Sequence, residues 1–195
     1  MNVVETNLPG VLVFEPKVLV DGRGLFLETF REDRFREMGV KETFVQENHS
    51  RSTRGVLRGL HYQLNQPQGK LVRVARGEVF DVVVDVRVGS PTFGQWYGTT
   101  LDEKSMRMMY VPPGFAHGFV VLSEVADFIY KCTDYYCPAS EQGILWSDSD
   151  VGVEWPFENT ADIVLSKKDV KNPRLKDQPD KLLPVYSAEP GAQST

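Results

Sequence analysis

The chain has 195 residues, of which 41% are hydrophobic and 25% charged, the composition of a water-soluble globular domain large enough to bury a core. Its formal net charge of −5 argues against bulk nucleic-acid binding, because such binding needs a basic surface. The N-terminal segment contains Glu5, Pro9, Glu15 and Pro16 and predicts no secretory signal, and no apolar run approaches the ~20 residues that span a bilayer.

Short apolar runs separated by turn residues extend over most of the chain. The clearest is 79–88, whose even positions are all apolar while its odd positions include Asp81, Asp85 and Arg87, so one face is expected to lie in a core. In chain order, strands are predicted at 10–20, 24–30, 43–48, 70–76, 79–88, 95–101, 108–111, 118–122 and 126–136. Many short strands at regular spacing predict a mainly β fold, a jelly-roll-like barrel or sandwich.

Helix is expected at two places. Residues 33–39 predict a short helix that ends at Gly39, and the segment from Ser166 to Asp169 fits a capping box that begins a second one. From residue 177 onward Pro, Ser, Gln and Gly dominate. We therefore expect one domain at 1–176 followed by a C-terminal arm or tail at 177–195.

The chain has two cysteines, Cys132 and Cys137. Their odd spacing puts them on opposite faces if the segment is one strand, so a disulfide between them is not expected. This pattern favours a reducing, cytoplasmic location.

Two segments combine histidine with residues that can bind an anion. His61 lies close to Arg58 and Lys70, and His117 ends a Pro-x-Gly-x-x-His pattern that begins at Pro112. A neutral imidazole can remove a proton near pH 7, and the two cations can hold an anionic substrate over it. The alternative interpretation is a core histidine with satisfied hydrogen bonds.

Arginines are concentrated locally in an otherwise acidic chain, at Arg51, Arg54, Arg58, Arg73 and Arg76. Such a cluster suits a small anionic ligand that is drawn into a cleft. It is equally consistent with a solvated strand face.

Nine ordered blocks of this sequence closely resemble the dTDP-4-dehydrorhamnose 3,5-epimerase family, and the resemblance covers roughly residues 2–176. The blocks are 14–17 (FEPK), 21–24 (DGRG), 44–50 (FVQENHS), 56–63 (VLRGLHYQ), 68–73 (QGKLVR), 77–82 (GEVFDV), 90–94 (SPTFG), 114–119 (GFAHGF) and 152–156 (GVEWP). The resemblance implies a cupin-type jelly-roll barrel. It also implies conversion of dTDP-4-dehydro-6-deoxy-D-glucose to dTDP-4-dehydro-L-rhamnose.

That reaction inverts two sugar carbons beside a ketone, and it needs a base, a donor at the ketone oxygen and an acid on the opposite face, with no redox cofactor and no metal. By resemblance, His61 is the base, Tyr130 the acid and Lys70 the group that stabilises the enolate. Asp169 is the carboxylate partner of the base. The structural alternatives are a core aromatic for Tyr130, a solvated lysine for Lys70, and capping of the segment at Ser166 for Asp169.

The resemblance also implies the residues that bind the substrate. Diphosphate contacts are expected from Arg23, Arg58 and Lys168, and stacking on thymine from Tyr136, which would share a strand face with Tyr130. Positions used around the sugar nucleotide in the family correspond to Gln46, Asn48, Glu28, His117 and Glu141. For the two glutamates the alternative is a solvated surface charge.

Other functions remain open at this stage. A metal-dependent cupin is suggested by the pattern that ends at His117, although a His-x-His motif is replaced here by His61-Tyr62-Gln63 and His49 lies too early to compensate. A C5-only epimerase and a binding module with a decayed active site are further alternatives. By resemblance we expect a homodimer in which the early strands, with Arg23 and Glu28, cross to the neighbouring subunit.

Overall fold

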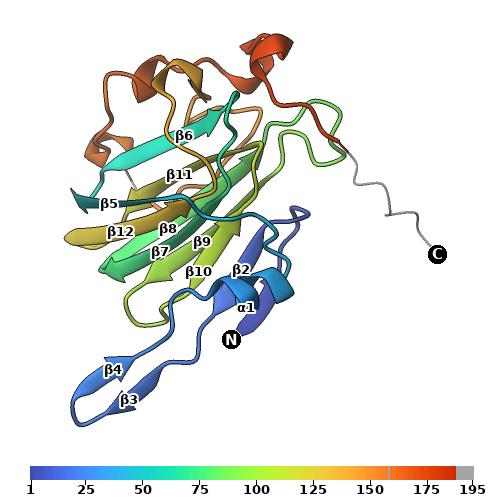
Figure 1. Ribbon diagram of the computed structural model, residues 1–195. Helices are drawn as coiled ribbons and strands as arrows, with labels where there is room; N and C mark the ends of the chain where they lie inside the picture. The colour runs from blue at the N-terminus through green and yellow to red at the C-terminus, as the bar shows by residue number, and fades with distance from the viewer. Residues whose placement is uncertain (158, 188–195) are drawn as a thin grey trace.

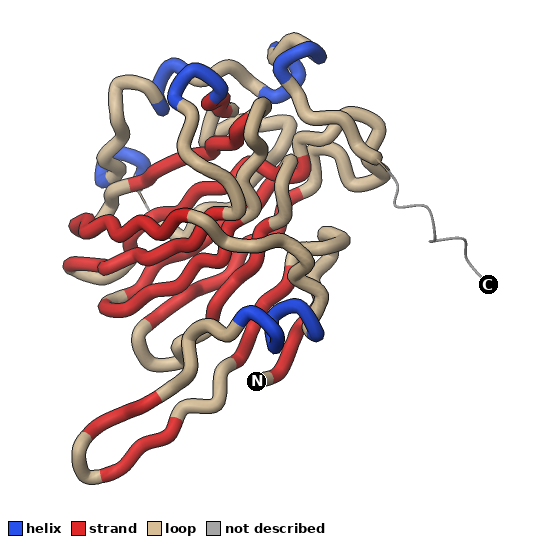
Figure 2. Tube along the Cα trace, viewed as in Figure 1, coloured by secondary structure: helices blue, strands red, loops and turns tan. Residues whose placement is uncertain are grey.

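The computed structural model describes residues 1–157 and 159–187, and in this part of the chain two antiparallel sheets pack face to face (Figure 1, Figure 2). The six-stranded sheet has the order β1 (Asn2–Glu5), β2 (Leu12–Glu15), β10 (Met108–Val111), β7 (Lys70–Arg76), β12 (Val125–Cys132) and β5 (Gln46–Thr53). The five-stranded sheet has the order β13 (Glu141–Gly143), β6 (Leu57–Gln63), β11 (Phe115–Val121), β8 (Glu78–Asp85) and β9 (Trp96–Asp102). A separate hairpin, β3 (Leu19–Asp21) and β4 (Gly24–Phe26), projects away from both sheets.

The predicted mainly β, jelly-roll architecture is confirmed, with two separate sheets in place of one closed barrel. The predicted strands at 70–76 and 108–111 have the observed bounds, whereas the run at 126–136 ends at Cys132 and the run at 10–20 divides into β2 and β3. Strands β1, β6 and β13 were not predicted. In β6 the glycine at position 59 interrupts the pattern, and most of the strand is buried on both faces, so no alternation is visible.

Strand β8 corrects the expectation that only one of its faces is buried. Its odd positions Val79 and Val83 lie in the core between the sheets, while its even positions Val82 and Val84 pack against a second core outside the five-stranded sheet. The polar residues Asp81 and Asp85, expected on a solvated face, are fully buried. The C-terminal segments that cover the outer face are the reason, since they contribute Ile144, Val151, Leu175 and Leu183 to the second core.

The first predicted helix is confirmed as α1 (Glu32–Glu37), which packs Phe35 against Phe14 on the outer face of the six-stranded sheet. The second predicted helix is wrong, because the segment does not form an α-helix. Ser166 Oγ does accept a hydrogen bond from the backbone N–H of Asp169 at 3.1 Å, but only a single 3₁₀ turn, η3 (Asp169–Lys171), follows. Other single turns are η1 (Pro138–Ser140), η2 (Thr160–Asp162), η4 (Leu175–Asp177) and η5 (Asp180–Leu182).

Residues 177–187, the first part of the segment expected as an arm or tail, pack on the outer face of the five-stranded sheet. The Tyr62 hydroxyl donates to the backbone oxygen of Leu182 at 2.9 Å, and Val185 forms an isolated β-bridge with Val88. The remainder of that segment, 188–195, lies outside the described residues.

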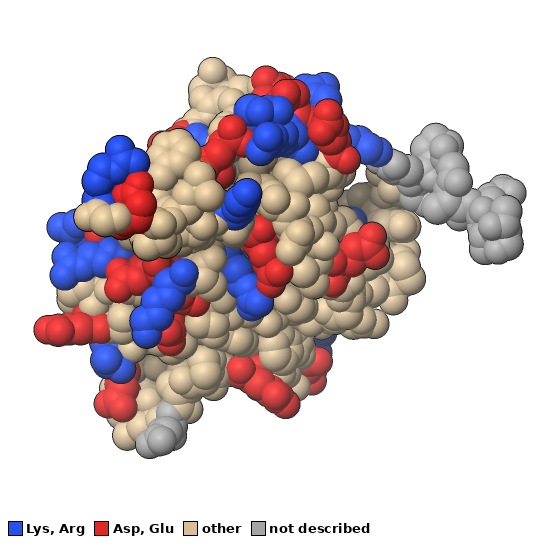
Figure 3. Space-filling model, turned by 90° about the horizontal axis from the view of Figure 1, so that it is seen from below, with Lys and Arg blue, Asp and Glu red and all other residues tan. Residues whose placement is uncertain are grey.

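The surface seen from below carries Lys and Arg side chains interspersed with Asp and Glu (Figure 3). Exposed ion pairs occur on the protein surface, for example Arg23 with Asp21 and Arg36 with Glu32. Within the described ranges no helix combines the length and apolar character needed to cross a membrane. Both cysteines are free thiols.

Candidate active site

A cavity of about 730 Å³ opens between the two sheets, which is ample for a sugar nucleotide. Its walls come from β5, β7 and β12 on one side and from β6 and β11 on the other, with the segment 164–169 closing one flank. Most of the predicted site residues line it, namely Gln46, Asn48, Arg58, His61, Lys70, His117, Tyr130, Tyr136, Glu141, Lys168 and Asp169.

His61 projects from β6 between two carboxylates. Its Nε2 lies 2.6 Å from Asp169 Oδ1, and its Nδ1 lies 3.6 Å from Glu141 Oε1. Burial alone would raise the pKa of Asp169, but His61 and Ser166 lower it below its ordinary value. The resulting carboxylate can only accept a hydrogen bond, so the proton of a neutral His61 lies on Nε2 and the lone pair on Nδ1.

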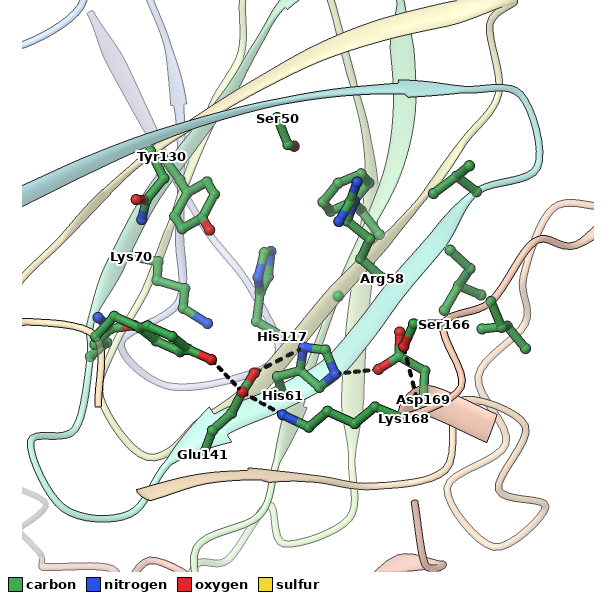
Figure 4. A pocket seen from close by; sticks show the side chains of 18 of the residues that line it. Ser50, Arg58, His61, Lys70, His117, Tyr130, Glu141, Ser166, Lys168 and Asp169 are labelled. Carbon is green, nitrogen blue, oxygen red and sulfur yellow. Dashed lines mark hydrogen bonds and ion pairs between the residues drawn. The ribbon is translucent and has the colours of Figure 1, made fainter. Parts of the chain in front are cut away.

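Tyr130 reaches the cavity from β12, on the sheet opposite His61, and Figure 4 shows the two side chains entering from opposite sides. Its ring packs at a centroid distance of 5.9 Å from Phe128, which belongs to the core between the sheets. Burial raises the pKa of Tyr130, so its phenol is neutral at pH 7. A neutral phenol that faces an imidazole across a cavity can donate a proton to the side of a substrate that the imidazole does not contact.

Lys70 and His117 lie between these two groups (Figure 4). Burial lowers the pKa of Lys70, so its ammonium group loses a proton at a lower pH than that of an exposed lysine. His117 Nε2 lies 2.8 Å from Asp81 Oδ1, and its ring stacks at 6.1 Å on Phe128. Asp81 and Phe128 therefore fix the ring of His117.

Two glycines bring β6 and β11 close together next to the histidines. A Cβ atom at Gly59 would lie 2.5 Å from Gly118 Cα, and one at Gly118 would lie 2.6 Å from the backbone oxygen of Arg58. The register of the pair shifts between His117 and Phe119, where this contact occurs. Only glycine permits this approach, which places His61 and His117 side by side on paired strands.

Polar groups cover the part of the cavity formed by β5. Gln46 Nε2 donates to Asn48 Oδ1 at 3.1 Å, as expected of residues that share a strand face. The Arg58 guanidinium donates to Ser52 Oγ at 3.2 and 3.3 Å, which leaves part of its fork open for an anion.

Three further residues form a hydrogen-bonded group at one end of the cavity. Lys168 Nζ donates to Glu141 Oε2, and the Tyr136 hydroxyl donates to the same oxygen at 2.8 Å. Burial would raise the pKa of Glu141, but Lys168 and Tyr136 lower it below its ordinary value. Tyr136 reaches the cavity from beyond the end of β12 and not from the strand face it was expected to share with Tyr130.

Arg23 and Glu28 do not line this cavity. Arg23 lies at the turn of the β3–β4 hairpin with 91% of its side chain exposed, where its guanidinium pairs with Asp21 at 2.6 Å. Glu28 pairs with Arg34 at 3.0 Å at the start of α1. Of the arginine cluster in the sequence, only Arg58 lines the cavity, and Arg51 pairs with Asp127 outside it.

Sequence reasoning missed several residues of the site. Ser50 lines the cavity with a buried Oγ that has no hydrogen-bond partner among the described residues, and the aliphatic side chains of Val56, Leu57, Val164 and Leu165 form one wall. Ser50, Val56 and Leu57 lie inside blocks that carry the family resemblance, but none was singled out as a site residue, because serine and apolar residues are common everywhere. Asp81 was visible in the strand pattern, but alternation placed it on the wrong face.

Residues 1–157 and 159–187 contain no set of metal ligands that would support the alternative of a metal-dependent cupin. No group of three or more His, Cys, Asp and Glu side chains converges there to hold a metal ion. His61 and His117 each have Nε2 beside a carboxylate of their own.

Comparisons with known proteins agree on one family. Residues 5–177 match a family model described as dTDP-4-dehydrorhamnose 3,5-epimerase. An enzyme of that name from Shigella flexneri is 53% identical over 179 residues, which are 91% of this chain and 97% of the relative. Another, from Neisseria gonorrhoeae, is 54% identical over 170 residues, 87% of this chain, and the chain spans about half of that relative's length (51%).

Solved structures agree as well. A crystal structure of dTDP-6-deoxy-D-glucose-3,5-epimerase from Legionella pneumophila in complex with dTDP-4-keto-L-rhamnose has a TM-score of 0.93 and 50% sequence identity to this chain. The match covers 96% of this chain and 99% of that one.

Proposed function

The chain belongs to the dTDP-4-dehydrorhamnose 3,5-epimerase family, and we propose that it inverts C3 and C5 of dTDP-4-dehydro-6-deoxy-D-glucose to give dTDP-4-dehydro-L-rhamnose. The observation that supports this most strongly is the opposition of His61 and Tyr130 across the cavity. A single base and a single acid on opposite faces of a ring are what inversion of a carbon requires.

His61 acts as the base through Nδ1, since Nε2 donates to Asp169. It removes the proton from a carbon next to the C4 ketone, and the electrons of that C–H bond pass into the ketone to form an enolate. Asp169 stabilises the imidazolium that results. This support matters because an imidazolium in a partly buried site needs a countercharge.

Tyr130 then donates its hydroxyl proton to the same carbon from the opposite face, and the enolate returns to a ketone. The electrons end on the carbon from which they came, so the step has no net oxidation and calls for no redox cofactor. Before the second inversion the proton on His61 must be lost and the Tyr130 phenolate reprotonated. Solvent that reaches the cavity can serve both transfers.

Lys70 stabilises the enolate oxygen by its charge, and His117 lines the cavity beside it. For the rest of the substrate we assign Arg58 and Lys168 to the diphosphate, and Tyr136 to stacking on the thymine. The remaining polar contacts with the sugar nucleotide come from Gln46, Asn48 and Glu141. In this assignment diphosphate binding draws Lys168 away from Glu141.

The functional unit we propose is a homodimer in which the β3–β4 hairpin reaches the neighbouring subunit, so that Arg23 and Glu28 complete the partner's cavity. The hairpin supports this, because its apolar residues are largely exposed, for example Val20 at 76% and Phe26 at 69%. Such a patch is costly in water unless a second protein surface covers it. A cytoplasmic location is also part of the proposal, and the two free thiols fit it.

The reaction is tested by incubating the enzyme with dTDP-4-dehydro-6-deoxy-D-glucose in heavy water and following each ring carbon by NMR. Deuterium at both C3 and C5 is expected. Exchange at one carbon alone would instead identify a single-carbon epimerase, and tight dTDP binding without any exchange would identify a binding module.

A further inference from the structure

Gln63 is a buried side chain, 6% exposed, to which the reaction described above gives no role. It lies two residues after His61, where the His-x-His motif of a metal-binding cupin would have its second imidazole. It does not line the cavity. Its Nε2 donates to the backbone oxygens of Gln66 at 2.6 Å and Tyr135 at 3.0 Å, and its Oε1 accepts from the backbone N–H of Cys137 at 2.9 Å.

The three partners of Gln63 require a carboxamide. The backbone oxygens of Gln66 and Tyr135 can only accept, so they need a side-chain atom that carries two protons. The backbone N–H of Cys137 needs an acceptor at the same end of the side chain. An imidazole nitrogen carries at most one proton and a carboxylate oxygen carries none when ionised. The amide at this position therefore ties backbone segments together in a way that a histidine could not.

The backbone that Gln63 holds belongs to residues 133–137, here called the Tyr136 loop, which lie between β12 and η1. Gln63 bonds to the residue directly before Tyr136 and to the residue directly after it. The N–H of Tyr136 itself donates to Gln46 Oε1 at 3.0 Å. Amide side chains from β6 and β5 thus fix the loop on both sides of Tyr136.

The ring of Tyr136 depends on these bonds, because packing alone cannot hold it. The residue lines the cavity but is 53% exposed, and its hydroxyl donates to Glu141 Oε2 at 2.8 Å. If the backbone of the loop were free to move, the ring would have to be ordered during binding, at a cost in affinity. The position of the ring over the cavity is therefore set by the backbone that carries it.

We propose that Gln63 is a positioning residue, which holds the Tyr136 loop so that the ring of Tyr136 is ready to stack on the thymine of the substrate. This inference deepens the proposed function and rests on it. Gln63 touches neither the substrate nor the reacting atoms and acts only through Tyr136. It supports nucleotide binding and has no part in the proton transfers of His61 and Tyr130.

Gln63→Glu tests this role, because it keeps the size of the side chain but replaces the donating nitrogen with an acceptor that faces two carbonyl oxygens. The Kd of dTDP and the KM of the sugar nucleotide should each rise about tenfold, while kcat stays within about threefold. The Kd of inorganic pyrophosphate should stay within about twofold, because Arg58 and Lys168 bind the diphosphate without Tyr136. Isothermal titration calorimetry measures both dissociation constants.

Gln178→Glu is the matched control. Gln178 is likewise buried, at 7% exposed, lies outside the cavity and donates from Nε2 to the Tyr62 hydroxyl at 3.0 Å. Its substitution should lower the urea midpoint and leave the Kd of dTDP within about twofold of the wild-type value. An equal loss of dTDP affinity in the two variants would show a general effect of stability and overturn the inference.

A double-mutant cycle with Tyr136→Ala shows whether Gln63 acts through the ring. In the Tyr136→Ala background, Gln63→Glu should change the Kd of dTDP by less than about twofold, because no ring remains to be positioned. A further tenfold loss in that background would overturn the inference. So would a wild-type dTDP affinity in Tyr136→Ala, since there would then be no stacking to support.

Gln63→Met provides a second test if Gln63→Glu does not fold, because it removes all three hydrogen bonds at similar volume and buries no charge. The same rise in the Kd of dTDP is expected, with Gln178→Met as its control. Wild-type dTDP affinity in folded Gln63→Glu or Gln63→Met would overturn the inference. Absence of deuterium exchange in the wild-type enzyme would instead overturn the proposed function.

Discussion

His61 and Tyr130 suit their proposed roles because their surroundings differ. His61 is held by an ionised carboxylate, which fixes its tautomer and can stabilise the imidazolium that forms when it removes a proton. Tyr130 lies against the aromatic core, and burial raises its pKa, so its phenol is protonated at neutral pH and can donate that proton to an enolate carbon. At the scale of single residues, the environment decides which group removes the proton and which returns it.

We predict that His61→Ala and Tyr130→Phe fail in different ways. His61→Ala should lose deuterium exchange at both carbons by about 10²–10⁴-fold, because no base remains. Tyr130→Phe should retain exchange from the His61 face but complete inversion slowly. Tyr135→Phe, which removes an exposed hydroxyl nearby, is the control. Wild-type turnover in Tyr130→Phe would show that another residue is the acid.

A second prediction concerns Asp127, whose pKa is held well below its ordinary value, chiefly by the hydrogen bonds from Arg51 and also by His49. A folded-state pKa below the unfolded value of ~3.9 stabilises the protein above that pH, and the benefit is lost as the pH falls through the folded-state value. Asp127→Asn should therefore lower the urea midpoint at pH 7. The difference from wild type should shrink below about pH 4, and a constant difference from pH 7 to pH 2 would contradict this account.

At the scale of elements, the contact between β6 and β11 positions both histidines. It depends on Gly59 and Gly118, whose backbones meet without side chains between them. Strand pairing alone would keep these two backbones farther apart. The same contact coincides with the irregular register near His117.

Gly118→Ala should accordingly destabilise the protein by about 2 kcal/mol or more, because the new methyl group would meet backbone atoms that cannot move aside. The free energy of unfolding in urea measures the effect. Gly22→Ala is the matched control, since a Cβ atom there meets nothing within 4 Å. Equal midpoints for the two variants would show that the strands can separate at little cost.

At the scale of the whole molecule, the cavity described here lacks two of the residues assigned to it. Arg23 lies at the turn of the β3–β4 hairpin and does not line the cavity of its own chain. The hairpin projects from the body of the protein (Figure 1). In the proposed homodimer each subunit supplies this residue to the other.

This arrangement predicts complementation. Arg23→Ala and His61→Ala should each be impaired, but co-expression of the two should restore about a quarter of wild-type activity. Half of the randomly formed dimers are mixed, and each of those has one intact site. Differently tagged subunits allow the mixed dimer to be isolated and assayed. A mixed dimer as inactive as its parents would place Arg23 in the cavity of its own chain, or in none.

Much of this protein could be predicted from local sequence. Short alternating runs with turn residues between them identified the mainly β fold, since strand periodicity is a local property. The ordered motifs around His61 and His117 identified the family and most of the cavity lining. The resemblance also named Asp169, although no local pattern links it to a histidine 108 positions earlier.

Only the tertiary structure decided which polar residues are buried and which side chains meet. Asp81 lies in a run that alternates between apolar and polar residues, the pattern of a strand with one exposed face. In the fold, however, the C-terminal segments cover the outer face of its sheet and the opposite sheet covers the inner face. Tyr136 and Lys168 meet at Glu141 although no strand carries all three. Burial, and contacts between residues far apart in the sequence, depend on how distant segments pack. Neither can be read from a residue and its near neighbours in the sequence.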